Sequence, residues 1–345
     1  MSSTTGEPVD QRQNVSARTS MKRRRFIGIA GGAAAWPLGA RAQQKTVPVI
    51  GFLNGGSADE FAPYFAAFRH GLTVMGYVDG QNVQIEYRNA EAHYDRLPTL
   101  AADLVQRNVS AIATFGLPAV RAAKAATRTI PIAFATGANP ITSGLVASFN
   151  RPGGNLTGIS LSESAMADKQ IEMLHEIVPK AELMGVLVNP TNPFYEDILP
   201  GLRAAASAIN IRLSIEHITS EQEIDTAFAS ISHLGAGAVF VVVDPLFQDR
   251  RDQLVALQDR YSLPTVVGGP EFPRNGGLMG YGANMTSVFY DLADYMGRIL
   301  KGARPEDLPV QQTTRIEVVI NLRTAKALGL TIPQWILGRA DDVIE

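Results

Sequence analysis

Asp244 is the acidic residue whose place in the sequence points most directly to a ligand. It follows the apolar run AVFVVV (238–243), which predicts a buried central strand. Open α/β sheets bind ligands beyond the carboxyl ends of their parallel strands, so a carboxylate there could pair with a ligand ammonium. The same residue before PLFQ also suits the N-cap of a helix, and both interpretations stay open. Glu271 in GGPEF is a weaker acidic candidate.

Loops after six predicted strands hold the other candidate ligand-binding residues. The loops are rich in Gly, Pro, Asn, Ser or Thr, which ordinary turns also use, but six of them facing one cleft favour a binding site. The candidates are Ser57 in NGGSAD, Gly116, Leu117 and Pro118 in GLPAV, Thr136 and Asn139 at GANPITSG, Asn189 and Tyr195 in NPTNPFY, Phe247 in DPLFQ, and Phe272 in GGPEF.

The residues predict no catalytic group, no cofactor and no metal site. There is no P-loop and no credible G-x-S-x-G elbow, and the absence of cysteine excludes disulfides, thiolate metal sites and a lipid-modified cysteine anchor. A formal net charge of -2, with no basic stripe after the N-terminal region, argues against nucleic acid as a partner. None of the histidines form a pair with zinc-site spacing: His70, His93, His175, His217 and His233.

Two series of alternating strands and helices must position these residues. Short runs rich in branched apolar residues alternate with segments of helical period, which is typical of parallel sheets covered on both faces. The pattern predicts two doubly wound α/β lobes in series. The expected strands are 47–53, 83–87, 111–115 and 130–136, then 184–188, 211–215, 238–243 and 264–267, with further elements at 277–282, 287–301 and 314–320.

The stretch RPGGNLTGIS (151–160) is interpreted as a turn that leads into a strand. A phosphate-binding loop would need a helix directly after the glycines, and none is predicted there. Gly158 and Ser160 at the end of this strand are expected at the first crossing between the lobes. They are therefore predicted hinge residues, and a Gly158→Pro variant should alter closure.

The N-terminal region reads as an export signal. Arg23 and Arg24 precede a short apolar stretch rich in Gly and Ala, and Ala40 and Ala42 offer small residues for cleavage after Ala42. The apolar part is too short for a membrane span, although a membrane-anchoring helix is the alternative. We expect a twin-arginine signal over 1–42, with Met1 or Met21 as the start, and a periplasmic protein with a net charge of about −7.

Several long motifs in the same order resemble one family. They include GLTVMGYVDGQNVQIEYRNAEAHYDRLPTLAADLV, IPIAFATGANPITSGLVASFNRPGGNLTGIS and ILKGARPEDLPVQQTTRIEVVINLRTAKALGLTIP. The chain is similar to the ABC-transporter substrate-binding proteins of the TrpX-like group over 47–345. One departure is Asn139, which stands before Pro140 where the family often has Asp.

The resemblance implies a type I periplasmic-binding-protein fold whose lobes are joined by a multi-crossing hinge. Residues 43–158 and 281–312 would form lobe one, and 159–280 and 313–345 lobe two. It also implies a solute receptor that delivers a small molecule to an ABC permease and its ATPase. The receptor itself would first be exported by the twin-arginine or the general export machinery.

For an amino acid or related organic acid, aromatic ones included, the ligand carboxylate would suit the helix start at GLPAV with the hydroxyl of Ser57 or Thr136. Asp244 would meet the ammonium, and Tyr195, Phe247 and Phe272 would either wall the side chain or pack in the core. A sugar or nucleoside receptor is the alternative, followed by a regulator effector domain and a secreted enzyme.

Overall fold

The structure is a computed structural model that describes residues 47–345, except for the side chains of residues 164 and 165. The predicted export signal, with Arg23, Arg24, Ala40 and Ala42, lies outside these residues. Within the described part, no helix combines the length and the apolar character that crossing a bilayer requires.

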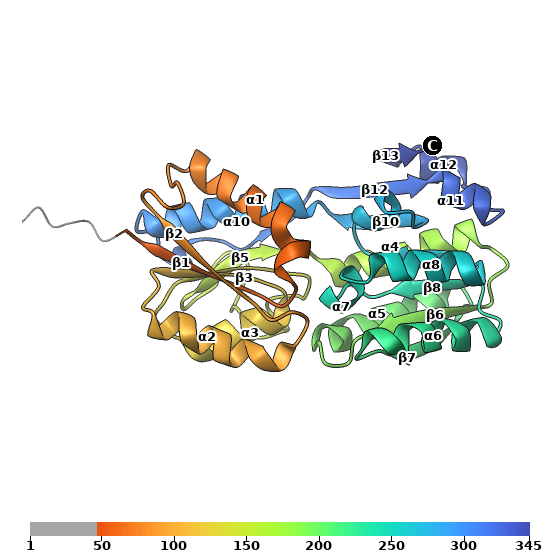
Figure 1. Ribbon diagram of the computed structural model, residues 1–345, viewed down its shortest axis with the longest axis horizontal. Coiled ribbons are helices and arrows are strands. Elements are labelled where there is room, and N and C mark those ends of the chain that lie inside the picture. Colours follow the sequence, from red (N-terminus) through yellow and green to blue (C-terminus); the bar gives the residue numbers. More distant parts are fainter. Residues whose placement is uncertain (1–46) are drawn as a thin grey trace, which may run out of the picture. The chain divides into compact units, whose positions relative to one another are not determined.

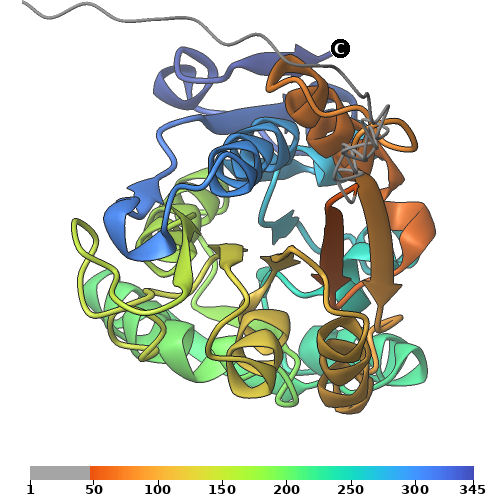
Figure 2. The same cartoon turned by 90° about the vertical axis from the view of Figure 1, so that its left-hand side faces the viewer.

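The first lobe is built on a six-stranded parallel sheet in the order β11-β5-β4-β3-β1-β2. Figure 1 shows α1 and α10 on one face of this sheet and α2 and α3 on the other, and Figure 2 shows the same layers end on. The strands are β1 (Val49–Asn54), β2 (Gln84–Asn89), β3 (Ala111–Phe115), β4 (Ile132–Thr136), β5 (Leu156–Ser160) and β11 (Gln311–Gln312). The helices are α1 (Ala58–Val74), η1 (Tyr94–Arg96), α2 (Leu97–Gln106), α3 (Leu117–Ala126), α10 (Met285–Leu300) and η2 (Pro305–Asp307).

The second lobe is built on a seven-stranded sheet in the order β13-β12-β10-β9-β8-β6-β7, in which only β10 and β12 pair antiparallel. Its strands are β6 (Leu183–Val188), β7 (Arg212–His217), β8 (Ala238–Val241), β9 (Thr265–Val267), β10 (Met279–Ala283), β12 (Ile316–Asn321) and β13 (Asp342–Ile344). Its helices are α4 (Glu163–Ile177), α5 (Phe194–Ala208), α6 (Glu221–His233), α7 (Pro245–Gln248), α8 (Arg251–Tyr261), α9 (Glu271–Arg274), α11 (Leu322–Ala327) and α12 (Gln334–Leu337).

Apolar side chains on both faces of each sheet hold the helices in place. In the first lobe, Phe52 of β1 stacks on Phe289 of α10 with ring centroids 5.7 Å apart and meets Phe65 and Phe68 of α1 edge-on. Alternate residues of β1 face the other layer, where Leu53 packs with the residues of α2 and α3. The predicted pair of parallel-sheet α/β lobes is confirmed. The central strands, such as β3, β4 and β8, are buried on both faces, as their continuous apolar runs indicated.

Side-chain caps fix where several helices begin. The hydroxyl of Ser57 accepts from the Glu60 amide at the start of α1, and the Asn284 side chain accepts from the Ser287 amide at the start of α10. Helix α6 begins with a capping box in which Ser220 and Glu223 bond each other's backbone amides. Polar residues directly after strands therefore end the strand and start the helix, which leaves the strand ends and helix starts at the same edge of each sheet.

The chain passes between the sheets three times, just after β5, after β10 and after β11. The boundaries expected at 158 and 280 fall inside β5 and β10, because the sequence marks strands less sharply at their ends than at their centres. Strand β5 lies entirely in the first sheet, and β10 lies entirely in the second. The first crossing begins after Ser160 and includes Ser162, which has a left-handed φ of 55°.

Gly158 lies in the middle of β5 and pairs with Phe134 of β4. Its φ is 153°, and a Cβ placed on it would lie 1.9 Å from the carbonyl oxygen of Phe134. The close approach of two strands is what requires glycine here. Gly158 was predicted at the crossing between the lobes, but it packs inside the first sheet instead. Ser160 is the last residue of the strand, and its carbonyl accepts a hydrogen bond from the Thr313 amide at 2.9 Å.

Candidate functional site

A cavity lies where the carboxyl ends of strands from both lobes meet. It consists of two adjoining hollows. The hollows share five lining residues, which come from the ends of β3 and α7, from the loop after β8 and from the starts of α4 and α5: Phe115, Gln248, Val243, Glu163 and Phe194.

Aromatic side chains form part of the cavity wall. Phe115 is the last residue of β3 and Phe194 the first residue of α5, and they are 9% and 4% exposed. Phe240 and Tyr281 line the first hollow from the second sheet. The cavity thus offers flat apolar surfaces that could contact a ring.

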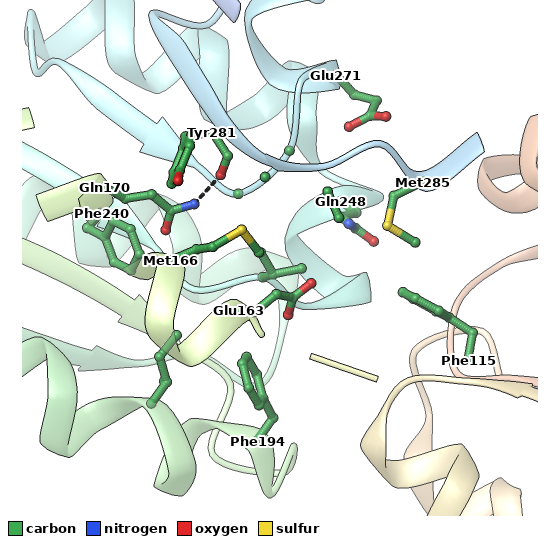
Figure 3. Close-up of a pocket in the computed structure, with 16 residues that line it drawn as sticks. Phe115, Glu163, Met166, Gln170, Phe194, Phe240, Gln248, Glu271, Tyr281 and Met285 are labelled. Carbon is green, nitrogen blue, oxygen red and sulfur yellow. Dashed lines mark hydrogen bonds between the residues drawn. The ribbon is translucent and has the colours of Figure 1, made fainter. Parts of the chain in front are cut away.

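Two carboxyl groups line the first hollow, and Figure 3 labels both. Burial raises the pKa of Glu163 to about 7. Burial also raises the pKa of Glu271, which lies beside Tyr64, with Arg251 and Arg274 opposing the rise. Over 47–345, no lysine, arginine or histidine lines either hollow.

Neutral polar groups complete the lining. Gln170 donates its side-chain amide to the carbonyl of Tyr281 (Figure 3). Gln248 belongs to both hollows, and its side-chain amide makes no hydrogen bond to the described residues. Thr136 of β4 accepts from the Ala138 amide at 3.3 Å. These groups could orient a polar ligand.

The start of α3 also faces the cavity. Gly116, Leu117, Pro118 and Ala119 line the second hollow beside Thr136. The first amides of a helix have no acceptor within the helix, although Pro118 lacks an N–H and the amide of Gly116 donates to Ala135. The amides of Leu117 and Ala119 are left to bind an anion.

Asp244 lies next to the cavity in a saturated hydrogen-bond network. One carboxylate oxygen accepts from the Asn189 side chain and the Leu246 amide, both at 3.0 Å. The other accepts from Tyr94 at 2.7 Å and Asn192 at 2.8 Å. Burial raises the pKa of Asp244 while these donors oppose the rise. All four acceptor positions of the carboxylate are filled.

The network bears on the two interpretations of Asp244. The residue is the N-cap of α7, as one interpretation predicted. Strand β8 ends at Val241, two residues earlier than the predicted strand. In this structure all acceptor positions of Asp244 are taken by protein donors, so none is open to a ligand ammonium. Burial and the charge of Asp244 raise the pKa of Tyr94, so its hydroxyl keeps the proton that it donates.

Further contacts join the lobes at the rim of the cavity. Ser57 donates to Asp249 at 3.0 Å, and Arg251 pairs with Glu60 at 3.1 Å. Tyr94 in lobe one and Asp244 in lobe two make a third contact. The pKa of Glu60 is raised mainly by burial and by Asp249, against the effect of Arg251. The lobes are therefore linked by polar contacts that opening would break.

The structure brings some of the predicted site residues to the cavity. Those that line it are Gly116, Leu117, Pro118, Thr136 and Glu271. Asn189 holds Asp244, and Ser57 lies at the rim with its hydroxyl engaged by Asp249. Asn139 is exposed, and its side chain accepts from the amides of Ile141 and Thr142, so it stabilises a turn.

The three predicted aromatic walls lie elsewhere. Phe247 and Phe272 are 0% and 1% exposed and belong to the core between the second sheet and α6 and α8, so the core-packing interpretation holds. Tyr195 packs against the core cluster that contains Phe194 and Ile198, and its ring centroid lies 6.2 Å from that of His217. Its neighbour Phe194 points to the cavity instead, because successive residues at a helix start face about 100° apart.

The sequence did not point to several residues of the site and its network, which include Tyr94, Phe115, Glu163, Asn192, Phe194 and Gln248 and, in the first hollow, Gln170, Phe240 and Tyr281. Phe115 carried a usable signal, because it is the last residue of a predicted strand. Glu163 follows a crossing between lobes, and a crossing leaves no periodic pattern. Tyr94 belongs to a short 3₁₀ turn in the segment after β2, whose strand-end loop was not among the six loops considered.

Comparisons with known proteins agree with this architecture. The tyrosine-binding protein of Clostridioides difficile (strain R20291) is 26% identical over 289 residues, which are 84% of this chain and 82% of the relative. A structure of the ABC domain from Streptococcus pneumonia in complex with L-Trp has a TM-score of 0.78 at 24% identity, over 86% of this chain and 99% of that one.

A conserved domain protein from Vibrio cholerae has a TM-score of 0.79 at 23% identity, over the same shares of the two chains. The shared architecture is the type I periplasmic-binding-protein fold, as the resemblance implied. The family model described as ABC transporter substrate binding protein matches residues 46–344. The chain therefore belongs to the family of ABC transporter substrate-binding proteins.

Proposed function

We propose that this protein is the extracytoplasmic receptor of an ABC importer and that it binds an amino acid or a related organic acid, with aromatic amino acids as the first candidates. The observation that carries the proposal is the cavity between the lobes, which combines the aromatic surfaces of Phe115 and Phe194 with hydrogen-bonding groups. Relatives named for tyrosine binding and solved with L-Trp support this ligand class.

The ligand carboxylate would lie at the start of α3. The amides of Leu117 and Ala119 and the hydroxyl of Thr136 face one hollow, and the positive end of the helix dipole favours a negative group. Ser57 is less suited to this role because its hydroxyl already donates to Asp249. The ligand ring would lie against Phe115 and Phe194.

Ligand binding would favour the arrangement in which the lobes are joined. A ligand that contacts both lobes stabilises that state relative to an open one. The contacts of Tyr94 with Asp244 and of Arg251 with Glu60 would then form together with the ligand contacts. The joined form would be what the permease and its ATPase receive, after export by the twin-arginine or general machinery.

A sugar or nucleoside receptor is the second candidate. The unbonded amide of Gln248 and the carboxyl of Glu163 could receive hydroxyl groups, and Phe115 could stack on a sugar face or a base. The same cavity could therefore serve either ligand class, and binding measurements separate them.

A thermal-shift screen tests the proposal. Residues 43–345 would be melted in the presence of amino acids, aromatic acids, sugars and nucleosides, because a ligand that binds only the folded state raises the melting temperature. We expect a shift of the melting temperature with an aromatic amino acid. A shift with a sugar or nucleoside and none with any amino or organic acid would contradict the proposed ligand class.

A further inference from the structure

Glu163 is a carboxyl group in the cavity with no partner among the described residues. It is the first residue of α4 and lines both hollows. Figure 3 shows its carboxyl in the space between Phe194, Gln248 and Phe115. Asp244, close by, receives four hydrogen bonds, whereas the side chain of Glu163 makes no hydrogen bond or ion pair with the groups that the structure describes, which leave out the side chains of residues 164 and 165.

The backbone around Glu163 leaves room for its carboxyl. A Cβ on Gly137 would lie 1.9 Å from one carboxyl oxygen of Glu163, so the glycine after β4 lets this group lie directly against the chain. The fold thus holds the carboxyl between the end of one sheet and the starts of helices from both lobes.

The groups that face Glu163 offer no positive side chain. From β3, β4 and α3 these are Phe115, the Gly137 backbone and the Gly116–Leu117 turn, and from α5 and α7 they are Phe194 and Gln248. The titratable groups that share the hollows are Glu271, Tyr94 and Tyr281, none of which is a cation. A carboxylate in such surroundings is costly unless a positive charge joins it.

We propose that Glu163 is the anionic partner of a protonated amine on the ligand, and that the cavity therefore selects a primary-amine ligand with an aromatic body. This inference rests on the proposed function and assigns the ammonium contact to Glu163 in place of Asp244. The amine would supply the missing counter-charge, and the faces of Phe115 and Phe194 would add cation–π attraction. The raised pKa of Glu163, which is caused by burial alone, agrees with an unpaired group.

The location of Glu163 also explains selection against ligands that lack an amine. A deaminated acid would bring a further carboxylate into a cavity that the carboxyl groups of Glu163 and Glu271 already line, with no cation among the lining residues to separate them. Like charges at short distance disfavour binding. The start of α3 would hold the ligand carboxylate of an amino acid, while Glu163 would discriminate between the amino acid and its deaminated form.

Titration calorimetry on the purified protein tests this contact with L-tryptophan, L-tyrosine, tryptamine and indole-3-propionate. For the wild type we expect both amino acids and the amine to bind, and the deaminated acid to bind at least about 100-fold more weakly, since a buried ion pair is lost. Glu163→Gln should weaken L-tryptophan and tryptamine by about 100-fold and leave indole-3-propionate unchanged or tighter.

Glu172→Gln is the matched control, because Glu172 lies on the same helix but pairs with Lys169 at 2.8 Å on the surface. It should leave all affinities unchanged. Equal binding of L-tryptophan and indole-3-propionate, with no effect of Glu163→Gln, would overturn the inference and leave the proposed function standing. Binding of none of these probes, together with binding of a sugar, would contradict both.

Discussion

At the scale of single residues, partners decide what a carboxyl group can do. Asp244 and Glu163 lie at the same cavity, and burial raises the pKa of both. Asp244 is surrounded by donors from the loop between β6 and α5, from η1 and from its own helix, so it organises structure. Glu163 has no donor around it within the described chain and remains able to bind. Sequence position alone favoured the first, and only the contacts separate the two.

The unpaired state of Glu163 predicts a pH dependence of stability. Its pKa of about 7 in the folded protein lies above the ordinary value of 4.5, so the folded state holds the proton more tightly than the unfolded state does. Its cost to stability is absent below pH 4.5, grows as the pH rises to about 7 and is then constant. Glu163→Gln removes this cost.

We therefore expect the ligand-free Glu163→Gln variant to melt at the wild-type temperature at pH 4 and above it at pH 8. Melting curves followed by circular dichroism at both values measure the gap. The other buried acids contribute equally to both proteins, so the difference isolates Glu163. A gap of the same size at pH 4 and pH 8 would contradict an unpaired carboxyl whose pKa is raised in the folded protein.

At the scale of elements, the end of one sheet is linked to a turn of the other lobe. The turn η1 carries Tyr94 across to the N-cap of α7, while Asn189 and Asn192 after β6 hold the same carboxylate. One residue of lobe one thus completes a network that is otherwise built within lobe two. The network makes Tyr94 a positioning residue for the joined lobes.

Removing the Tyr94 hydroxyl should weaken ligand binding. Tyr94→Phe loses a hydrogen bond to a carboxylate, which is worth about 1.5–3 kcal/mol, and the loss falls on the joined state. We expect faster ligand release and an affinity about 10-fold or more lower, measured by stopped-flow fluorescence and calorimetry with the ligand found in the screen. Tyr290→Phe, on α10 and without a hydrogen bond in the described part, is the control. Unchanged release in Tyr94→Phe would contradict the role of the network.

Strand β5 supplies a prediction about packing. Gly158→Ala would bring a methyl group against the carbonyl of Phe134, whereas Gly154→Ala has nothing within 4 Å and bears only the strain of a positive φ of 70°. Urea unfolding should show a loss of about 1 kcal/mol for Gly154→Ala and at least twice that for Gly158→Ala. Equal losses of unfolding free energy in the two variants would mean that only the positive φ of Gly158, and not the close approach of Phe134, requires glycine.

Sequence patterns predicted the elements better than the contacts between them. The apolar runs located the parallel strands, since these are buried on both faces. The same reasoning placed Leu117 and Thr136 at the cavity, because strand ends and helix starts gather at one edge. It chose Tyr195 for the cavity wall where the structure has Phe194, because a single sequence does not show which way the first residues of a helix point. It missed Tyr94, because a contact between lobes leaves no pattern in a single sequence.

At the scale of the whole molecule, two sheets contribute their carboxyl ends to one cavity. Lobe one brings Phe115 and the start of α3, and lobe two brings Glu163, Phe194 and Gln248. Neither lobe encloses the cavity by itself, which makes ligand binding and the joining of the lobes one event. We therefore expect a small amine-bearing ligand to bind between the lobes, in contact with both.

A crystal structure of the protein grown with saturating L-tryptophan tests this claim most directly. The account predicts electron density for the amino acid inside the cavity, with its ring against Phe115 and Phe194, its carboxylate at the start of α3 and its amine within hydrogen-bond distance of Glu163. Density for the ligand outside the cavity, or in the cavity with its amine on Asp244, would contradict it.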